Sequence, residues 1–127
     1  QLSNPPILSL APLLASLKLF EEVGMPALVR KRKTLTAYLE FILREIDRET
    51  ESRFEIITPE DRGCQLSVFL HGEGRPLFDY LMAAGIITDW REPNVIRLAP
   101  APFYCAFADM YHFGQVLKKG IEADLTA

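Results

Sequence analysis

The spacing of apolar residues along the chain predicts four helices. The segments with helical periodicity are residues 7–20, 26–49, 76–84 and 106–121. The first of them is apolar almost throughout, with Lys18 as its only charge, and Gly24 is expected to end it. A helix without a polar face needs to be buried on more than one side. A domain of this size covers a helix on one side only, so the first helix predicts a partner structure outside this chain.

Four further segments have the composition of strands. They are residues 54–58, 64–70, 86–89 and 95–98. In the second segment apolar and polar residues alternate, with Phe69 as the exception, which indicates a sheet with one covered face. The short connections favour antiparallel pairing. The order of elements therefore predicts an α+β fold, a two-layer small domain with an antiparallel sheet covered mainly on one side by helices.

Composition narrows the classes of function. The chain has 127 residues, of which 49% are hydrophobic, enough for the core of one domain. Its net charge of −3 argues against a general nucleic-acid-binding protein, which presents a basic face. The apolar run at 7–20 is too short to span a bilayer, and no leader opens the chain. Cys64 and Cys105 form no CxxC pattern and fit a reducing compartment. We expect a cytoplasmic protein with neither a membrane nor a nucleic acid as partner.

The usual catalytic side chains are sparse. His71 and His112 are the only histidines, and neither is paired in sequence with a nucleophile, so each is interpreted as an ordinary surface or partly buried residue. No spacing such as HExxH predicts a metal site. The basic run at 30–33 is interpreted as a solvated helix face, and Glu40 and Arg44 have the spacing of a helical ion pair.

The last predicted strand offers a candidate binding residue. Side chains alternate along a strand, so Ile96 and Leu98 are expected to face the core and Arg97 the reverse side. A guanidinium group is always charged, and its planar fork suits a carboxylate or phosphate. The residues alone leave two interpretations open: an anion-binding arginine, or a surface arginine paired with Asp89 or Glu92.

Several stretches of the chain match the motifs of one known family. They are Gln1–Leu8, Ala15–Leu17 followed by Glu22–Met25, Leu35–Glu40, Ile57–Pro59, Arg62–Ser67 and Asp89–Tyr104. In this order they resemble the C-terminal portion of kynureninase, and the resemblance covers essentially the whole chain. One departure is Cys105, where the family usually has asparagine. We therefore expect residues 1–24 to be a loop and apolar helix linking to a missing large domain, and residues 25–127 to be the C-terminal small domain.

The resemblance implies an activity and a set of site residues. Kynureninases are homodimeric hydrolases of fold type I that depend on pyridoxal 5′-phosphate as electron sink. They cleave a carbon–carbon bond of kynurenine or 3-hydroxykynurenine, giving alanine and anthranilate or its 3-hydroxy form, in tryptophan catabolism by the kynurenine pathway and in NAD biosynthesis. By its motif, Arg97 is expected to bind the substrate α-carboxylate. Asn4 is expected to reach the cofactor, and Ser3 to line the pocket for the aromatic ring. The Ser-Asn pair resembles family members that favour 3-hydroxykynurenine.

The resemblance also implies what this chain lacks. The family's cofactor-binding lysine, its phosphate-binding loop and the aspartate at the pyridinium nitrogen belong to the portion upstream. The five lysines of this chain match none of these positions: Lys18, Lys31, Lys33, Lys118 and Lys119. We expect the 127 residues alone to neither hold the cofactor nor turn over kynurenine. Two other interpretations stay open: the small domain of a cysteine desulfurase or aminotransferase, and a non-catalytic α+β ligand-binding module.

Overall fold

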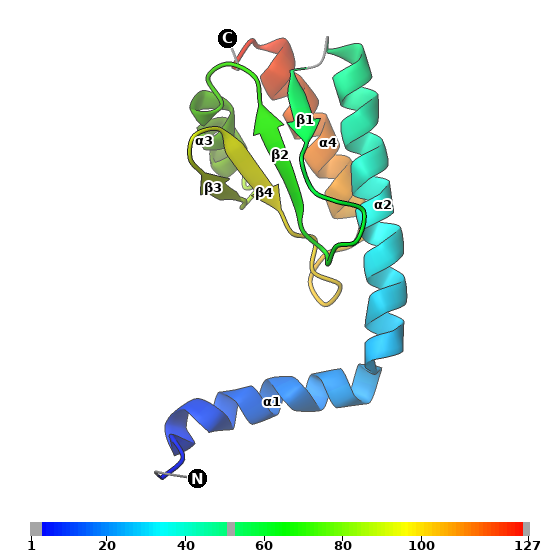
Figure 1. Cartoon of the computed structure of the whole chain (residues 1–127), viewed down its shortest axis with the longest axis vertical. Coiled ribbons are helices and arrows are strands. Elements are labelled where there is room, and N and C mark those ends of the chain that lie inside the picture. The colour runs from blue at the N-terminus through cyan, green and yellow to red at the C-terminus, as the bar shows by residue number, and fades with distance from the viewer. Residues whose placement is uncertain (1–3, 51–52, 126–127) are drawn as a thin grey trace.

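The computed structural model describes residues 4–50 and 53–125, which form four helices and four strands (Figure 1). The helices are α1 (Ile7–Val23), α2 (Met25–Glu49), α3 (Arg75–Ala83) and α4 (Phe107–Glu122). The strands are β1 (Phe54–Ile56), β2 (Leu66–Leu70), β3 (Asp89–Arg91) and β4 (Val95–Leu98). The order of elements is the expected one, and the predicted α+β class is confirmed.

The position of β3 corrects one prediction. The strand expected at 86–89 begins only at Asp89 and runs to Arg91. The reason is local: the backbone N–H of Ile86 donates to the carbonyl of Leu81 at 2.9 Å, which ties this segment to the end of α3. Ile87 is then 86% exposed. Residues 86–88 therefore form a connection, although their composition is typical of a strand.

The four strands form one antiparallel sheet in the order β1-β2-β4-β3. Burial alternates along the two central strands, because successive side chains point to opposite faces. The buried side chains of these strands face the helices: Leu66, Val68, Leu70, Ile96 and Leu98. The prediction that Ile96 and Leu98 belong to the core and Arg97 to the other face is confirmed.

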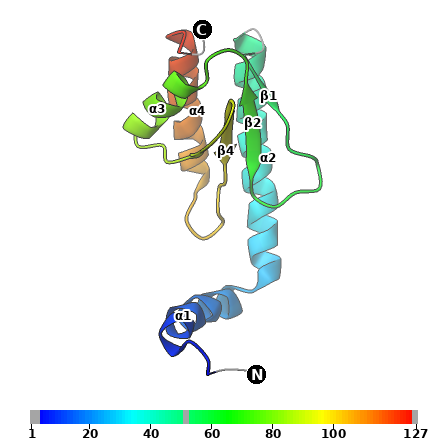
Figure 2. The same cartoon turned by 60° about the vertical axis from the view of Figure 1, so that its left-hand side comes forward.

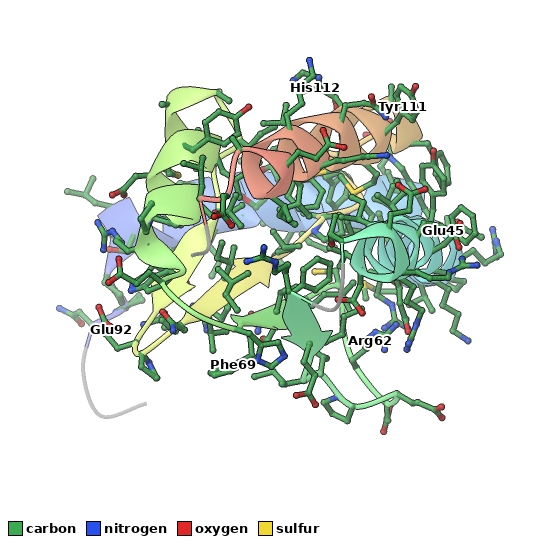
Figure 3. All side chains as sticks on the ribbon, turned by 90° about the horizontal axis from the view of Figure 1, so that it is seen from above. Glu45, Arg62, Phe69, Glu92, Tyr111 and His112 are labelled. Carbon is green, nitrogen blue, oxygen red and sulfur yellow. The ribbon has the colours of Figure 1, made fainter. Side chains whose placement is uncertain are left out.

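Helices α2, α3 and α4 cover one face of the sheet (Figures 1 and 3). Leucines of α2, among them Leu35 and Leu43 with no exposed surface, pack into the same core as the apolar side of α4. Gly114 allows α4 to approach α2 closely, since a Cβ there would lie 2.5 Å from Ile42 Cγ2. The opposite face of the sheet has no helix over it in the described part of the chain.

Helix α1 stands apart from this two-layer unit. A single residue, Gly24, separates it from α2, and its φ of +78° is one that favours glycine. The two views in Figures 1 and 2 show α1 extending away from the sheet and the other helices. None of its residues is buried, and Leu8 is 92% exposed. One contact that holds the end of α1 is the edge-to-face stacking of Phe20 on Phe103, with ring centroids 4.9 Å apart.

Despite this apolar surface, α1 does not meet the criteria for a transmembrane segment. None of the helices in residues 4–50 and 53–125 combines the length and the hydropathy that crossing a bilayer requires.

Candidate functional site

The sheet face turned away from the helices, called here the open face, carries the candidate binding residue. Ser67, Arg97 and Asp89 lie in register on β2, β4 and β3 and form a polar row across the sheet. Phe69 and Val95 form part of the neighbouring row on the same face. In Figure 3, Phe69 lies on the side of the sheet opposite to Tyr111 and His112 of α4. The central strand β4 thus presents a guanidinium group on the sheet face that no helix of the described residues covers.

Arg97 forms an ion pair across the strands with Asp89. Its Nε and Nη2 atoms both contact Oδ2 of Asp89, and Nε of Arg91 donates to the same oxygen at 3.1 Å. The pairing register of β3 and β4 places Asp89 directly opposite Arg97. Glu92, the other acid considered as a partner, instead accepts a hydrogen bond from Trp90 Nε1 at 2.9 Å. Of the two acids considered as partners of Arg97, Asp89 forms the ion pair and Glu92 does not.

This ion pair does not use the whole guanidinium group. A guanidinium offers five N–H donors, and Asp89 contacts only the edge formed by Nε and Nη2. Within the described residues, Asp89 is the sole hydrogen-bond partner of the Arg97 side chain, which is 32% exposed. The end of the group, formed by Nη1 and Nη2, stays available for a planar anion. Arg97 is therefore held by one ion pair, and its remaining N–H groups have no partner among the described residues.

Of the other two predicted site residues, the structure describes only Asn4, and it does not bring Asn4 to Arg97. Ser3 lies outside the described residues. Asn4 is exposed and lies just before α1, whose N-terminal end is remote from the sheet in both Figure 1 and Figure 2. The roles assigned to Ser3, Asn4 and Arg97 stay predictions.

Two of the described lysines make contacts unlike those of a lysine that attaches an aldehyde cofactor covalently. Such a lysine needs a lowered pKa, which comes from burial or from a neighbouring positive charge. Lys118 has the opposite environment, because its hydrogen bond and ion pair with Glu49 at 2.6 Å raise the pKa of its ammonium group. Lys31 donates to the carbonyl of Pro102 at 2.6 Å on the surface. The contacts of Lys118 therefore do not suit the covalent attachment of an aldehyde.

A cavity of about 320 Å³ opens between the α3–β3 connection, the end of β4 and the start of α4. Its lining includes Thr88, Cys105, Asp109 and His112 but not Arg97. Asp109 acts as a helix cap there, since its carboxylate accepts the backbone N–H of Ala106 at 2.7 Å. This cavity is thus separate from the open face.

Some of the other candidate residues have structural roles. Within the described residues, no three His, Cys, Asp or Glu side chains are grouped so as to hold a metal ion. His71 stacks edge-to-face on Phe69, with ring centroids 5.5 Å apart. In the basic run, Arg32 donates to the backbone carbonyls of Arg62 and Gly63, which ties the β1–β2 connection to α2.

Two residues near Arg97 on the open face were not identified from the sequence. Ser67 and Arg91 join it only through the pairing register of the sheet. A signal for Arg91 was present: if the strand before the turn is extended to Arg91, alternation puts it on the same face as Asp89.

The comparisons with known proteins agree with the fold and the motifs. Residues 28–117 match the family described as "Kynureninase C-terminal domain". The chain is 73% identical to the kynureninase of Christiangramia forsetii over 124 residues, which cover 95% of this chain and 29% of the relative. It is 70% identical to the kynureninase of Flavobacterium psychrophilum, with the same coverage. With the kynureninase of Xanthomonas campestris pv. campestris it shares 50% identity over 87% of this chain and 27% of the relative.

The chain therefore spans less than a third of the length of these relatives, while nearly all of its own length is matched. The resemblance to kynureninase stated from the motifs is confirmed. With the match covering most of α2 through most of α4, the chain belongs to the family of kynureninase C-terminal domains.

Proposed function

We propose that this chain is the C-terminal part of a pyridoxal-phosphate-dependent kynureninase, and that it supplies the group that binds the substrate's α-carboxylate. The complete enzyme hydrolyses L-kynurenine or 3-hydroxykynurenine to L-alanine and anthranilate or 3-hydroxyanthranilate. The cofactor is held mainly by the portion of the protein outside this chain and acts as the electron sink. The complete protein is a cytoplasmic homodimer of the kynurenine pathway, which leads from tryptophan toward NAD.

One observation supports this role above the others. Arg97 lies on a central strand, on the face that no helix covers, and the end of its guanidinium group is available. A planar cation on a rigid strand binds a carboxylate with two parallel hydrogen bonds and so sets the orientation of the amino acid. Orientation of this kind contributes to catalysis, because the bond to be cleaved must lie correctly at the reacting centre.

Helix α1 supports the expectation that a larger structure completes the site. Its exposed apolar side includes Leu10, Leu13, Leu14 and Leu17. An apolar surface of this kind is typical of a protein–protein or domain interface. The matched region covers 95% of the chain in relatives more than three times as long, so most of α1 is part of what is shared with them. We infer that α1 packs against the remainder of the complete protein.

Ser3 and Asn4 are assigned through the same proposal. They lie beyond the N-terminal end of α1, so the docking of α1 on the remainder of the protein would determine where they sit. In the proposed enzyme Asn4 reaches the cofactor, and Ser3 lines the pocket for the aromatic ring. The Ser-Asn pair then favours 3-hydroxykynurenine over kynurenine.

The test uses the complete coding region that contains this chain. The purified complete protein, supplied with pyridoxal phosphate, should release anthranilate from kynurenine or 3-hydroxyanthranilate from 3-hydroxykynurenine, followed by fluorescence. The 127-residue chain assayed in the same way should release neither and should retain no stoichiometric pyridoxal phosphate after dialysis. A complete protein that cleaves neither substrate contradicts the proposed activity. A 127-residue chain that binds the cofactor stoichiometrically contradicts the proposal that the cofactor is held mainly outside this chain.

A further inference from the structure

The open face also carries Asp89, which contacts Arg97 and restricts the orientation of its guanidinium group. Asp89 contacts the Nε–Nη2 edge of the guanidinium group through one oxygen, Oδ2. An arginine side chain has four rotatable bonds and loses much rotamer freedom when it is fixed. A carboxylate that contacts Nε and Nη2 together restricts rotation about the last of these bonds. Asp89 therefore fixes the plane of the guanidinium group and leaves Nη1 outside the ion pair.

Asp89 is itself well fixed, although it lies on an edge strand. Arg91 Nε bonds the same Oδ2 atom at 3.1 Å, which restricts the carboxylate from a second direction. The side chain of Trp90 between them packs on Phe78, with ring centroids 5.6 Å apart, and is partly buried against the core. The strand that carries Asp89 is thus anchored from below the sheet while its carboxylate stays on the open face.

We propose that Asp89 is a positioning residue for substrate recognition, which holds Arg97 ready to receive the α-carboxylate end-on. This inference rests on the proposed function of Arg97. Asp89 does not touch the substrate in this arrangement. Its contribution is to organise the binding group beforehand, so that less conformational freedom is lost when the amino acid binds.

The negative charge of Asp89 also opposes the binding of a carboxylate, so the two effects must be compared. Asp89 is 49% exposed, and its repulsion of a second carboxylate is therefore weakened by solvent. Arg91, bound to the same oxygen, offsets that charge further. The group of two arginines and one aspartate keeps a net charge of +1. The proposal requires orientation to outweigh this weakened repulsion, and removing the charge of Asp89 should then weaken substrate binding.

The test compares variants of the complete, cofactor-loaded protein. Asp89→Asn should raise KM for the amino acid substrate about tenfold, equivalent to about 1.4 kcal/mol, and leave kcat within about threefold. The matched control is Asp79→Asn, which removes the charge of an exposed aspartate paired with Arg75 on α3 and should change KM less than twofold. Retention of pyridoxal phosphate and the melting temperature, measured for each variant, separate positioning from loss of folding.

Each outcome decides between the two proposals. An unchanged or lowered KM in Asp89→Asn, or a loss confined to kcat, overturns the positioning role even if Arg97→Ala is severely impaired. An equal rise of KM in Asp79→Asn and Asp89→Asn overturns it as well, because the effect would then not depend on the contact between Asp89 and Arg97. If Arg97→Ala keeps the KM of the unaltered protein, both proposals fail, since Asp89 acts only through Arg97.

Discussion

Arg62, in the connection between β1 and β2, forms an ion pair with Glu40 of α2. The two side chains are only 16% and 20% exposed. Glu40 also accepts a hydrogen bond from Arg44 at 3.0 Å, as its helical spacing predicted. One carboxylate thus receives two guanidinium groups, one from its own helix and one from a loop, and links that loop to the helix layer.

This carboxylate predicts a pH dependence of stability. The hydrogen bond from Arg44 lowers the pKa of Glu40 below its ordinary value of 4.5, burial opposes this, and Arg62 lowers it further. A lowered pKa in the folded state contributes stability above about pH 4.5, and the contribution is lost as pH falls through the folded-state value. Glu40→Gln should therefore reduce the free energy of unfolding by about 0.5–1 kcal/mol at pH 7.

Urea unfolding of the unaltered chain and of Glu40→Gln, at pH values from 7 down to 3, measures this difference. The two curves should converge as the solution becomes more acidic than pH 4.5. A difference that is constant over this range would show that Glu40 stabilises the fold without its charge.

Substitution of a buried leucine of α2 should reduce the free energy of unfolding more than Glu40→Gln does. Leu43 has no exposed surface, and Phe41, two residues earlier on the same helix, is 57% exposed. Leu43→Ala should reduce the free energy of unfolding by about 2–5 kcal/mol, because it removes buried methyl groups and leaves a cavity. Phe41→Ala is the matched control and should change it by less than about 0.5 kcal/mol in the 127-residue chain. Chemical denaturation followed by circular dichroism measures both, and similar losses would contradict the helix orientation described here.

If Arg97 binds the substrate, its removal should weaken substrate binding without releasing pyridoxal phosphate. In the complete protein, Arg97→Ala should raise KM for the amino acid substrate by about tenfold or more, because a charge-assisted bidentate contact is lost. Pyridoxal phosphate should stay bound, since the cofactor is held mainly outside this chain. Absorbance of the dialysed variant measures the retained cofactor. Loss of the cofactor with an unaltered KM would assign Arg97 to the cofactor instead of the substrate.

The exposed surface of α1 predicts association of the chain when it is isolated. Leu13 and Leu17 lie on its apolar side and are 50% and 53% exposed. We expect the 127-residue chain to form concentration-dependent oligomers, and the double substitution Leu13→Lys, Leu17→Lys to reduce this association without unfolding α2–α4. Light scattering after size exclusion measures the mass of both. A chain that is monomeric at all concentrations would show that α1 needs no apolar partner.

Local pattern was enough to identify most of the fold. Helix α2 begins and ends within one residue of its predicted limits, because its leucines and isoleucines recur at helical spacing and Pro26 suits its first turn. Strand β4 lies where it was predicted. Its buried residues Ile96 and Leu98 alternate with Val95 and Arg97, and prolines bracket the segment. Both inferences rest on periodicity, which a linear sequence records directly.

The partner of Arg97 depended on tertiary structure. The sequence predicted the face on which Arg97 lies, because alternation along a strand is a local property. It could not choose between Asp89 and Glu92, because that choice depends on which backbone groups of β3 and β4 pair, and β3 was predicted three residues too early. The same limit applies to α1: its composition showed that it needs cover, and the fold shows that α2, α3 and α4 do not provide it. Contacts between distant segments follow from how whole elements pack, and a local pattern does not contain that information.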